Sequence, residues 1–186
     1  LKRVDQVSVL RTQRAGRVEV FCGRDELLVL LGVPVQGPDE GGLPIVVYNV
    51  PGRTGCNVDP TTLARLASIP HVAGVKEASG NVTQICEVLN AVPADFLVLS
   101  GDDALTLPAM AVGARGVVSV ASNEVPAEMA QLVQAAEAND FVFARELHSR
   151  LLPLMLANFA ESNPIPVKAL MAQMGLLEES YRLPMV

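Results

Sequence analysis

The chain has 186 residues, and 50% of them are hydrophobic, so it can bury a core and is not expected to be disordered. The formal net charge of −6 at pH 7 and the scatter of the basic residues argue against a nucleic-acid-binding protein. Cys22, Cys56 and Cys86 form no C-x-x-C pair and His71 lies far from His148, so we expect reduced thiols and no metal site. The sequence has neither an apolar run of about 20 residues nor a signal-peptide pattern, which predicts a soluble, cytoplasmic protein.

The first 42 residues differ in pattern from the rest of the chain. Residues 1–16 mix basic and polar side chains without a period, and residues 18–22 and 27–35 are apolar runs broken by Gly and Pro. A Gly-rich loop at residues 36–42 follows, and we place a domain boundary there. The predicted parts are an unmatched N-terminal segment (1–42), a region of βα units (43–125) and a helical region (126–186).

From residue 43 onward, short β-branched runs alternate with amphipathic stretches, a rhythm typical of βα units. The runs are almost entirely apolar, as expected for parallel strands that are buried on both faces. Strands are predicted at residues 43–50, 72–77, 96–100 and 116–120, and none later. Helices are predicted at residues 61–68, 81–92, 103–112, 126–139, 141–158 and 166–174.

Lys76 lies near the end of the second predicted strand. Parallel strands present their carboxyl ends on one face, where active sites assemble. Burial of an isolated ammonium is unfavourable, so an apolar site favours the neutral amine, which is the nucleophile that imine formation requires. The alternative is that Lys76 pairs with Glu77 or an aspartate, or extends to solvent. The residues alone slightly favour this alternative.

Other polar residues follow the same strand ends. Tyr48 fits a general acid–base role or a core tyrosine with a satisfied hydroxyl. Arg53, in a Gly-rich turn, fits a bidentate grip on a substrate carboxylate or a solvated loop arginine. Asp102 and Asp103 fit an acid–base pair, but N-capping of the next helix is favoured for at least one of them.

A series of motifs in order resembles the dihydrodipicolinate synthase family of class I aldolases, in the N-acetylneuraminate lyase superfamily, over residues 43–186. The motifs are residues 48–55 (YNVPGRTG), 74–81 (GVKEASGN), 99–103 (LSGDD), 116–120 (GVVSV) and 163–168 (NPIPVK). The resemblance implies an α/β fold, a partial TIM (β/α)8 barrel that matches strands 5–8 and the C-terminal helices.

The resemblance also implies a Schiff-base-forming lyase that condenses pyruvate with L-aspartate 4-semialdehyde to 4-hydroxy-tetrahydrodipicolinate in lysine and diaminopimelate biosynthesis. Lys76 matches the family's Schiff-base lysine and Tyr48 its proton-relay tyrosine. Arg53 matches the arginine that binds the aldehyde's carboxylate, and Val118 the position whose main chain contacts pyruvate. Gly101, at the end of the next strand, is a further substrate-binding candidate. No cofactor is expected. The resemblance implies a homo-oligomer, such as the family's tetramer. Lys168 is interpreted as structural.

The front half of the family's barrel has no counterpart in residues 1–42, which contain neither its Thr-Thr-Gly-Glu type loop nor its Tyr-Tyr segment. Half a barrel has open sheet edges and an uncovered apolar interior, so we expect the isolated chain to self-associate. Two alternatives stay open: a non-catalytic half-barrel, and a sister aldolase that uses another aldehyde. Arg53 favours the synthase over the sister enzyme, but weakly.

Overall fold

A computed structural model of the chain describes residues 6–10, 18–22 and 44–185. The strands are β1 (Gln6–Leu10), β2 (Val18–Cys22), β3 (Ile45–Asn49), β4 (Val72–Glu77) and β5 (Leu97–Ser100). The α-helices are α1 (Pro51–Thr54), α2 (Pro60–Ala67), α3 (Val82–Ala91), α4 (Thr106–Ala111), α5 (Pro126–Glu137), α6 (Phe141–Ala157) and α7 (Ile165–Gln173). Two short 3-10 helices are η1 (Asp103–Leu105) and η2 (Ala121–Asn123).

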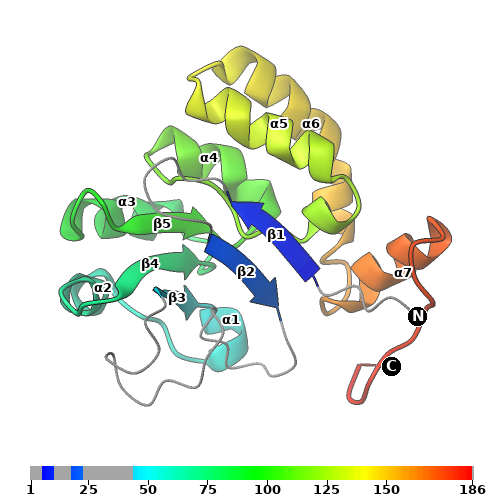
Figure 1. Ribbon diagram of the computed structural model, residues 1–186, viewed down its shortest axis with the longest axis horizontal. Helices are drawn as coiled ribbons and strands as arrows, with labels where there is room; N and C mark the ends of the chain where they lie inside the picture. The colour runs from blue at the N-terminus through cyan, green and yellow to red at the C-terminus, as the bar shows by residue number, and fades with distance from the viewer. Residues whose placement is uncertain (1–5, 11–17, 23–43, 186) are drawn as a thin grey trace.

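A parallel sheet with the strand order β3-β4-β5 lies on the left in Figure 1, beside α2 and α3. Its three strands coincide, within one or two residues, with the first three strands predicted from the apolar runs. Tyr48 on β3 is paired with Lys76 on β4, and Lys76 is paired with Leu99 on β5. The βα rhythm of the sequence is therefore confirmed as a parallel sheet.

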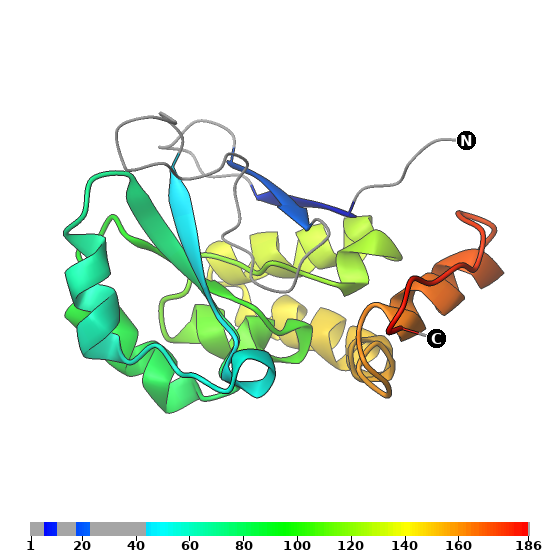
Figure 2. The ribbon, with the colours of Figure 1, turned by 90° about the horizontal axis from the view of Figure 1, so that it is seen from below.

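One face of this sheet packs on α2 and α3, which lie along the same side of the strands (Figure 2). Val75 on β4 and Val98 on β5 point to this side and share a core with Leu63 of α2 and with Ile85 and Val88 of α3. Successive side chains of a strand alternate between its faces. Tyr48, Lys76 and Leu99 therefore point to the opposite face.

A second core lies between the helices that follow the sheet. In Figure 1, α5 and α6 lie side by side, with α4 packed against them. Leu132 of α5 is fully buried against Ala144, Leu147 and Met155 of α6. The apolar spacing on these helices places their buried side chains on one stripe, as the predicted helices at 126–139 and 141–158 require.

The predicted strand at residues 116–120 is wrong. The segment makes only an isolated parallel bridge, between Ser100 and Val117. Two main-chain bonds hold this bridge, from the Ser100 N–H to the Gly116 carbonyl over 2.9 Å and from the Val118 N–H to the Ser100 carbonyl over 2.8 Å. The chain then turns into η2, because the Asp103 carboxylate accepts the next free main-chain amides and ends the extended conformation.

Other elements differ from those predicted. Residues 51–54, part of the predicted Gly-rich turn, form the single helical turn α1, and the predicted helix at 103–112 is divided into η1 and α4. The apolar run at 18–22 is a strand, β2, which pairs antiparallel with the unpredicted strand β1. The run at 27–35 and the boundary at residue 42 lie outside the described residues, so the domain division stays a prediction. No helix in the described ranges is long and apolar enough to cross a membrane.

Candidate active site

Lys76 and Tyr48 are stacked on the face of the sheet that points away from α2 and α3. The Lys76 Nζ atom lies 3.9 Å from the centroid of the Tyr48 ring, and both side chains are half-buried. Their backbones are register partners on adjacent parallel strands, which brings the two side chains side by side. The amine of Lys76 and the phenol of Tyr48 therefore meet near the carboxyl end of the sheet, as the strand-end argument predicts.

The pairing of Lys76 with Glu77, considered as an alternative, does not occur. Glu77 is 2% exposed and its side chain points to the helix-covered face. Its Oε2 atom accepts hydrogen bonds from Asn49 Nδ2 at 2.9 Å and from Gln84 Nε2 at 3.1 Å, and its Oε1 atom accepts from the Ser79 amide at 2.7 Å. Adjacent residues of a strand face opposite sides, so this carboxylate cannot stack with the neighbouring amine.

Asn49 and Glu77 form a buried polar pair whose structural role the sequence reasoning missed. Asn49 is 1% exposed, and its Oδ1 atom accepts from the Val58 amide at 3.0 Å. A signal was present: Asn49 and Glu77 each lie two residues after an apolar strand position, so each shares its face with a core valine. Polar groups at such positions are expected to find hydrogen-bond partners.

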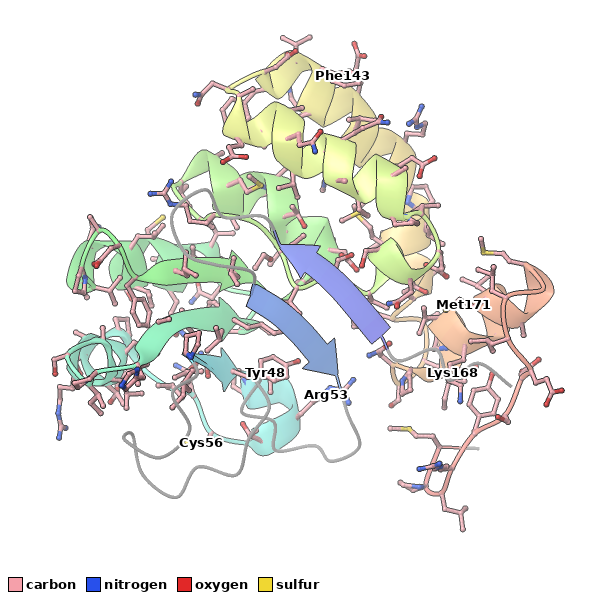
Figure 3. All side chains as sticks on the ribbon, viewed as in Figure 1. Tyr48, Arg53, Cys56, Phe143, Lys168 and Met171 are labelled. Atoms are coloured by element: carbon pink, nitrogen blue, oxygen red, sulfur yellow. The ribbon has the colours of Figure 1, made fainter. Side chains whose placement is uncertain are left out.

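Arg53 projects from α1, at the end of β3, and Figure 3 shows it near Tyr48. The side chain is exposed, and its Nη2 atom donates a hydrogen bond of 3.1 Å to the Asn163 carbonyl. α1 ends at Gly55, whose φ of +68° suits the left-handed cap that glycine adopts without strain. This turn follows β3 directly, so it places Arg53 near the carboxyl end of that strand.

Gly101 and Val118 both lie beside Ser100, the last residue of β5. The Gly101 N–H donates to the Glu77 carbonyl over 2.7 Å, and a Cβ at Gly101 would lie 2.5 Å from the Ala78 Cβ. The side chain of Val118 is buried, and its N–H is bonded to Ser100. The main chain of Val118 therefore lies beside the carboxyl end of β5.

Asp102 and Asp103 are not a catalytic pair of carboxylates. Asp102 caps η1, because its Oδ1 atom accepts from the Ala104 amide at 2.9 Å, which confirms the N-cap interpretation. The buried Asp103 instead accepts from the amides of Val120 and Ala121, both at 2.9 Å. Burial raises the pKa of Asp103, and hydrogen bonds from Ser119 and from the two amides oppose this rise.

Lys168 lies away from the stacked pair, on α7 (Figure 3). Its Nζ atom donates to the Ser180 carbonyl and lies 5.1 Å from the centroid of the Tyr181 ring, so it ties α7 to the C-terminal segment. His148 is half-buried on α6, where burial lowers its pKa, and His71 is exposed. Cys56 and Cys86 carry free thiols.

Two cavities of about 400 Å³ each lie elsewhere in the fold. One is beside α2 and is lined by Thr62, Arg65, Leu66, Ser68 and Ile69. The other lies between α4 and α6 and is lined by Leu107, Pro108, Ala111, Phe141, Arg145 and His148. Neither cavity is lined by Tyr48 or Lys76. The candidate active site is therefore defined by its side-chain geometry rather than by these cavities.

A family model described as the dihydrodipicolinate synthetase family matches residues 38–186. A 4-hydroxy-tetrahydrodipicolinate synthase from Koribacter versatilis is 60% identical over 143 residues, which are 77% of this chain and 48% of that protein.

Solved structures agree with the sequence matches. Dihydrodipicolinate synthase from Aquifex aeolicus superposes with a TM-score of 0.78 at 43% identity, covering 80% of this chain and 51% of that one. The pyruvate complex of chloride-inhibited dihydrodipicolinate synthase from Acinetobacter baumannii has a TM-score of 0.76 at 39% identity, covering 78% of this chain and 50% of that one. The chain thus spans about half the length of the relatives it matches, and its α/β fold corresponds to part of their barrel.

Proposed function

This chain belongs to the dihydrodipicolinate synthetase family, and from that membership we propose that Lys76 forms a Schiff base with pyruvate. The observation that carries the proposal is the stacking of Lys76 on Tyr48, with 3.9 Å between Nζ and the ring centroid. An amine that is half-buried beside a phenol has both a reduced hydration shell and a nearby proton donor. The full proposed reaction joins pyruvate to L-aspartate 4-semialdehyde and yields 4-hydroxy-tetrahydrodipicolinate and water.

The first step is addition of the amine to the ketone. Lys76 Nζ attacks C2 of pyruvate, a C–N bond forms, and the carbonyl oxygen takes up a proton to give a carbinolamine. Loss of that oxygen as water leaves the imine, and Tyr48 is proposed to move the protons of both stages. Loss of a proton from the pyruvate methyl group then gives an enamine, whose carbon attacks the aldehyde carbon of the second substrate, and the aldehyde oxygen takes up a proton to become a hydroxyl. The amino group of the second substrate then attacks the imine carbon, which closes the ring and releases the Lys76 amine.

Arg53, Val118 and Gly101 are proposed to bind the substrates. The Arg53 guanidinium carries a planar fork of donors that matches a carboxylate, and it is exposed beyond the end of β3. The main chains of Val118 and Gly101 lie at the end of β5, and Lys76 lies one residue before the end of the neighbouring strand β4. A small keto acid on Lys76 would therefore be flanked by main-chain groups on one side and by Arg53 beyond Tyr48.

Borohydride trapping tests this proposal directly. The chain is incubated with pyruvate, reduced and weighed by mass spectrometry, and the modified residue is located by peptide mapping. We expect one adduct, on Lys76, which Lys76→Arg abolishes and the matched control Lys168→Arg retains. A folded chain that gives no adduct would overturn the catalytic proposal, and an adduct that survives Lys76→Arg would overturn the assignment of the lysine.

The alternatives make different predictions in the same experiment. A non-catalytic half-barrel gives no adduct, whereas a sister aldolase gives the adduct but does not consume it when L-aspartate 4-semialdehyde is added. Homo-oligomer formation and a cytoplasmic location are part of the same proposal, and both are supported by family membership.

A further inference from the structure

Tyr48 and Lys76 form the stacked pair on one face of the sheet. The next residue of each strand, Asn49 on β3 and Glu77 on β4, forms a second pair on the opposite, helix-covered face. Asn49 is the register partner of Glu77, as Tyr48 is of Lys76. We propose that Asn49 and Glu77 are positioning residues, which hold Tyr48 in place over Lys76 through a buried hydrogen bond between β3 and β4. The inference rests on the proposed Schiff-base role of Lys76.

The geometry of parallel strands makes this coupling direct. A shift of β3 along β4 would move Tyr48 relative to Lys76 by the same amount that it moves Asn49 relative to Glu77. The Asn49 Nδ2 to Glu77 Oε2 hydrogen bond of 2.9 Å and the main-chain bond of 2.8 Å from the Ala78 N–H to the Asn49 carbonyl both oppose such a shift. The relative positions of both pairs therefore depend on the same register between β3 and β4.

The Glu77 carboxylate is held from three sides. Besides Asn49 on β3, it accepts from Gln84 on α3 at 3.1 Å and from the Ser79 amide in the turn after β4 at 2.7 Å. In the described part of the chain its donors are all amides, which have fixed planes and so direct the carboxylate more narrowly than a mobile ammonium would. A buried carboxylate with both oxygens engaged has one favourable position.

Asn49 carries the network to the loop that follows α1. Its Oδ1 atom accepts from the Val58 amide at 3.0 Å, and its Nδ2 atom also lies 2.9 Å from Asn57 Oδ1. Asn57 in turn contacts Gln84, with 2.9 Å from Asn57 Nδ2 to Gln84 Oε1. The network therefore closes on itself across β3, β4, α3 and the loop, and the Arg53 turn lies between two of its anchors.

A donor–acceptor exchange isolates this hydrogen bond. Glu77→Gln is nearly isosteric but replaces one acceptor oxygen with an amide donor, which opposes either Asn49 and Gln84 or the Ser79 N–H. Asn49→Asp places one carboxylate against another and removes the donor of the Asn49–Glu77 hydrogen bond. The double variant restores one donor and one acceptor in reversed order, and the amides of Asn57 and Gln84 can rotate to match it. A positioning role predicts loss in each single variant and recovery in the double variant.

The position of Lys76 against Tyr48 is read by NMR on the full chain. Reductive methylation with 13C-formaldehyde labels the lysines, which are Lys2, Lys76 and Lys168. We expect the Lys76 signal to be displaced by the ring current of Tyr48, and Tyr48→Leu to define its undisplaced value. Each single exchange variant should move the signal toward that value, and the double variant should return it.

Pyruvate trapping on unmethylated chain gives the second readout. We expect each single variant to lower the trapping rate at saturating pyruvate by about tenfold or more, because misplacement of about 1 Å is enough for losses of this size. The pyruvate concentration at half-saturation should change less. The control is Asn158→Asp in the buried Asn158–Glu124 pair, where 2.7 Å separates Nδ2 from Oε2. It should lower the melting temperature while leaving the Lys76 signal and the trapping rate unchanged.

The outcomes separate the two proposals. If Asn49→Asp leaves both the signal and the trapping rate unchanged in a folded chain, the positioning role is overturned and the Schiff-base function stands. If the unmodified chain is not trapped, the function fails, and the NMR displacement alone decides the positioning role. If the exchange variants do not fold, Gln84→Met removes only one donor to Glu77, and an unchanged Lys76 signal in that variant would overturn the proposal.

Discussion

The Arg53 guanidinium donates a hydrogen bond of 3.1 Å to the main-chain carbonyl of Asn163, which lies 110 residues farther along the chain. This bond joins α1, at the end of β3, to the segment that leads into α7. Arg53 is exposed, so the bond itself contributes little to stability. Its consequence is a tether between the end of β3 and the segment before α7, two parts of the chain that are far apart in sequence.

We expect Arg53→Lys to change the free energy of unfolding by less than about 1 kcal/mol, as for other exposed polar contacts. Pyruvate trapping on Lys76 should be unaffected. The rate at which added L-aspartate 4-semialdehyde consumes the reducible adduct should fall about tenfold or more, since an ammonium cannot hold a carboxylate at two points. An unchanged consumption rate would contradict the proposed role of Arg53 in aldehyde binding.

Gly74→Ala should destabilise the sheet. A Cβ at Gly74 would lie 2.5 Å from the Leu97 carbonyl oxygen and 2.7 Å from the Leu97 Cβ, so β4 and β5 would have to separate. Overpacking of this kind costs about 1–3 kcal/mol, measurable by urea denaturation. Gly52→Ala is the matched control, because a Cβ there meets no atom within 4 Å. Equal unfolding free energies of the two variants would show that β5 can move away from β4 without loss of stability.

Asp103 should make the chain less stable as the pH rises. Burial raises the pKa of Asp103 in the folded state above its ordinary value of 3.8, so the folded state binds the proton more tightly than the unfolded state does. This contribution to stability is present below the unfolded pKa and is lost as the pH rises through the folded pKa.

Asp103→Asn lacks this ionisation but keeps an oxygen that can accept from the amides of Val120 and Ala121. The free energy of unfolding of the unmodified chain minus that of the variant should therefore fall as the pH rises from about 4 to 7. Urea titrations at each pH measure this difference, in which the His148 contribution is common to both proteins. A difference that rises with pH would mean that hydrogen bonds to Asp103 outweigh its burial.

Leu63→Ala should cost about 2–5 kcal/mol of unfolding free energy, because Leu63 is 0% exposed and links α2 to the core beneath the sheet. Leu183→Ala, at a side chain that is 84% exposed, should change stability by less than about 0.5 kcal/mol. Thermal and urea denaturation of the two variants compare them. Similar losses at both positions would contradict the assignment of the core.

Self-association of the isolated chain is the remaining prediction. Large apolar side chains are exposed on the later helices and the C-terminal segment, among them Leu156, Phe159, Met174 and Leu176. Exposed apolar side chains favour association where they gather on one surface. Sedimentation velocity should show species larger than a monomer whose fraction grows with protein concentration. A single monomeric species at all concentrations would contradict this prediction.

The sequence by itself determined the central elements and the identity of the stacked pair. Apolar runs bounded by Pro and capping residues are local signals, so β3, β4, β5 and the long helices were predicted within a few residues. The family motifs pointed to Lys76 and Tyr48, and the strand-end rule placed them on one edge of the sheet. These inferences succeed because period and capping depend on neighbours in sequence.

Only the tertiary structure decided how polar groups are satisfied inside the fold. Glu77 finds Asn49 across 28 positions of the chain, and Asn158 finds Glu124 across 34, so no local pattern reveals either pair. The failed strand at residues 116–120 has the same cause. Its apolar run is typical of a strand, but the amides that follow are taken by the Asp103 carboxylate, which reaches them only once the chain is packed.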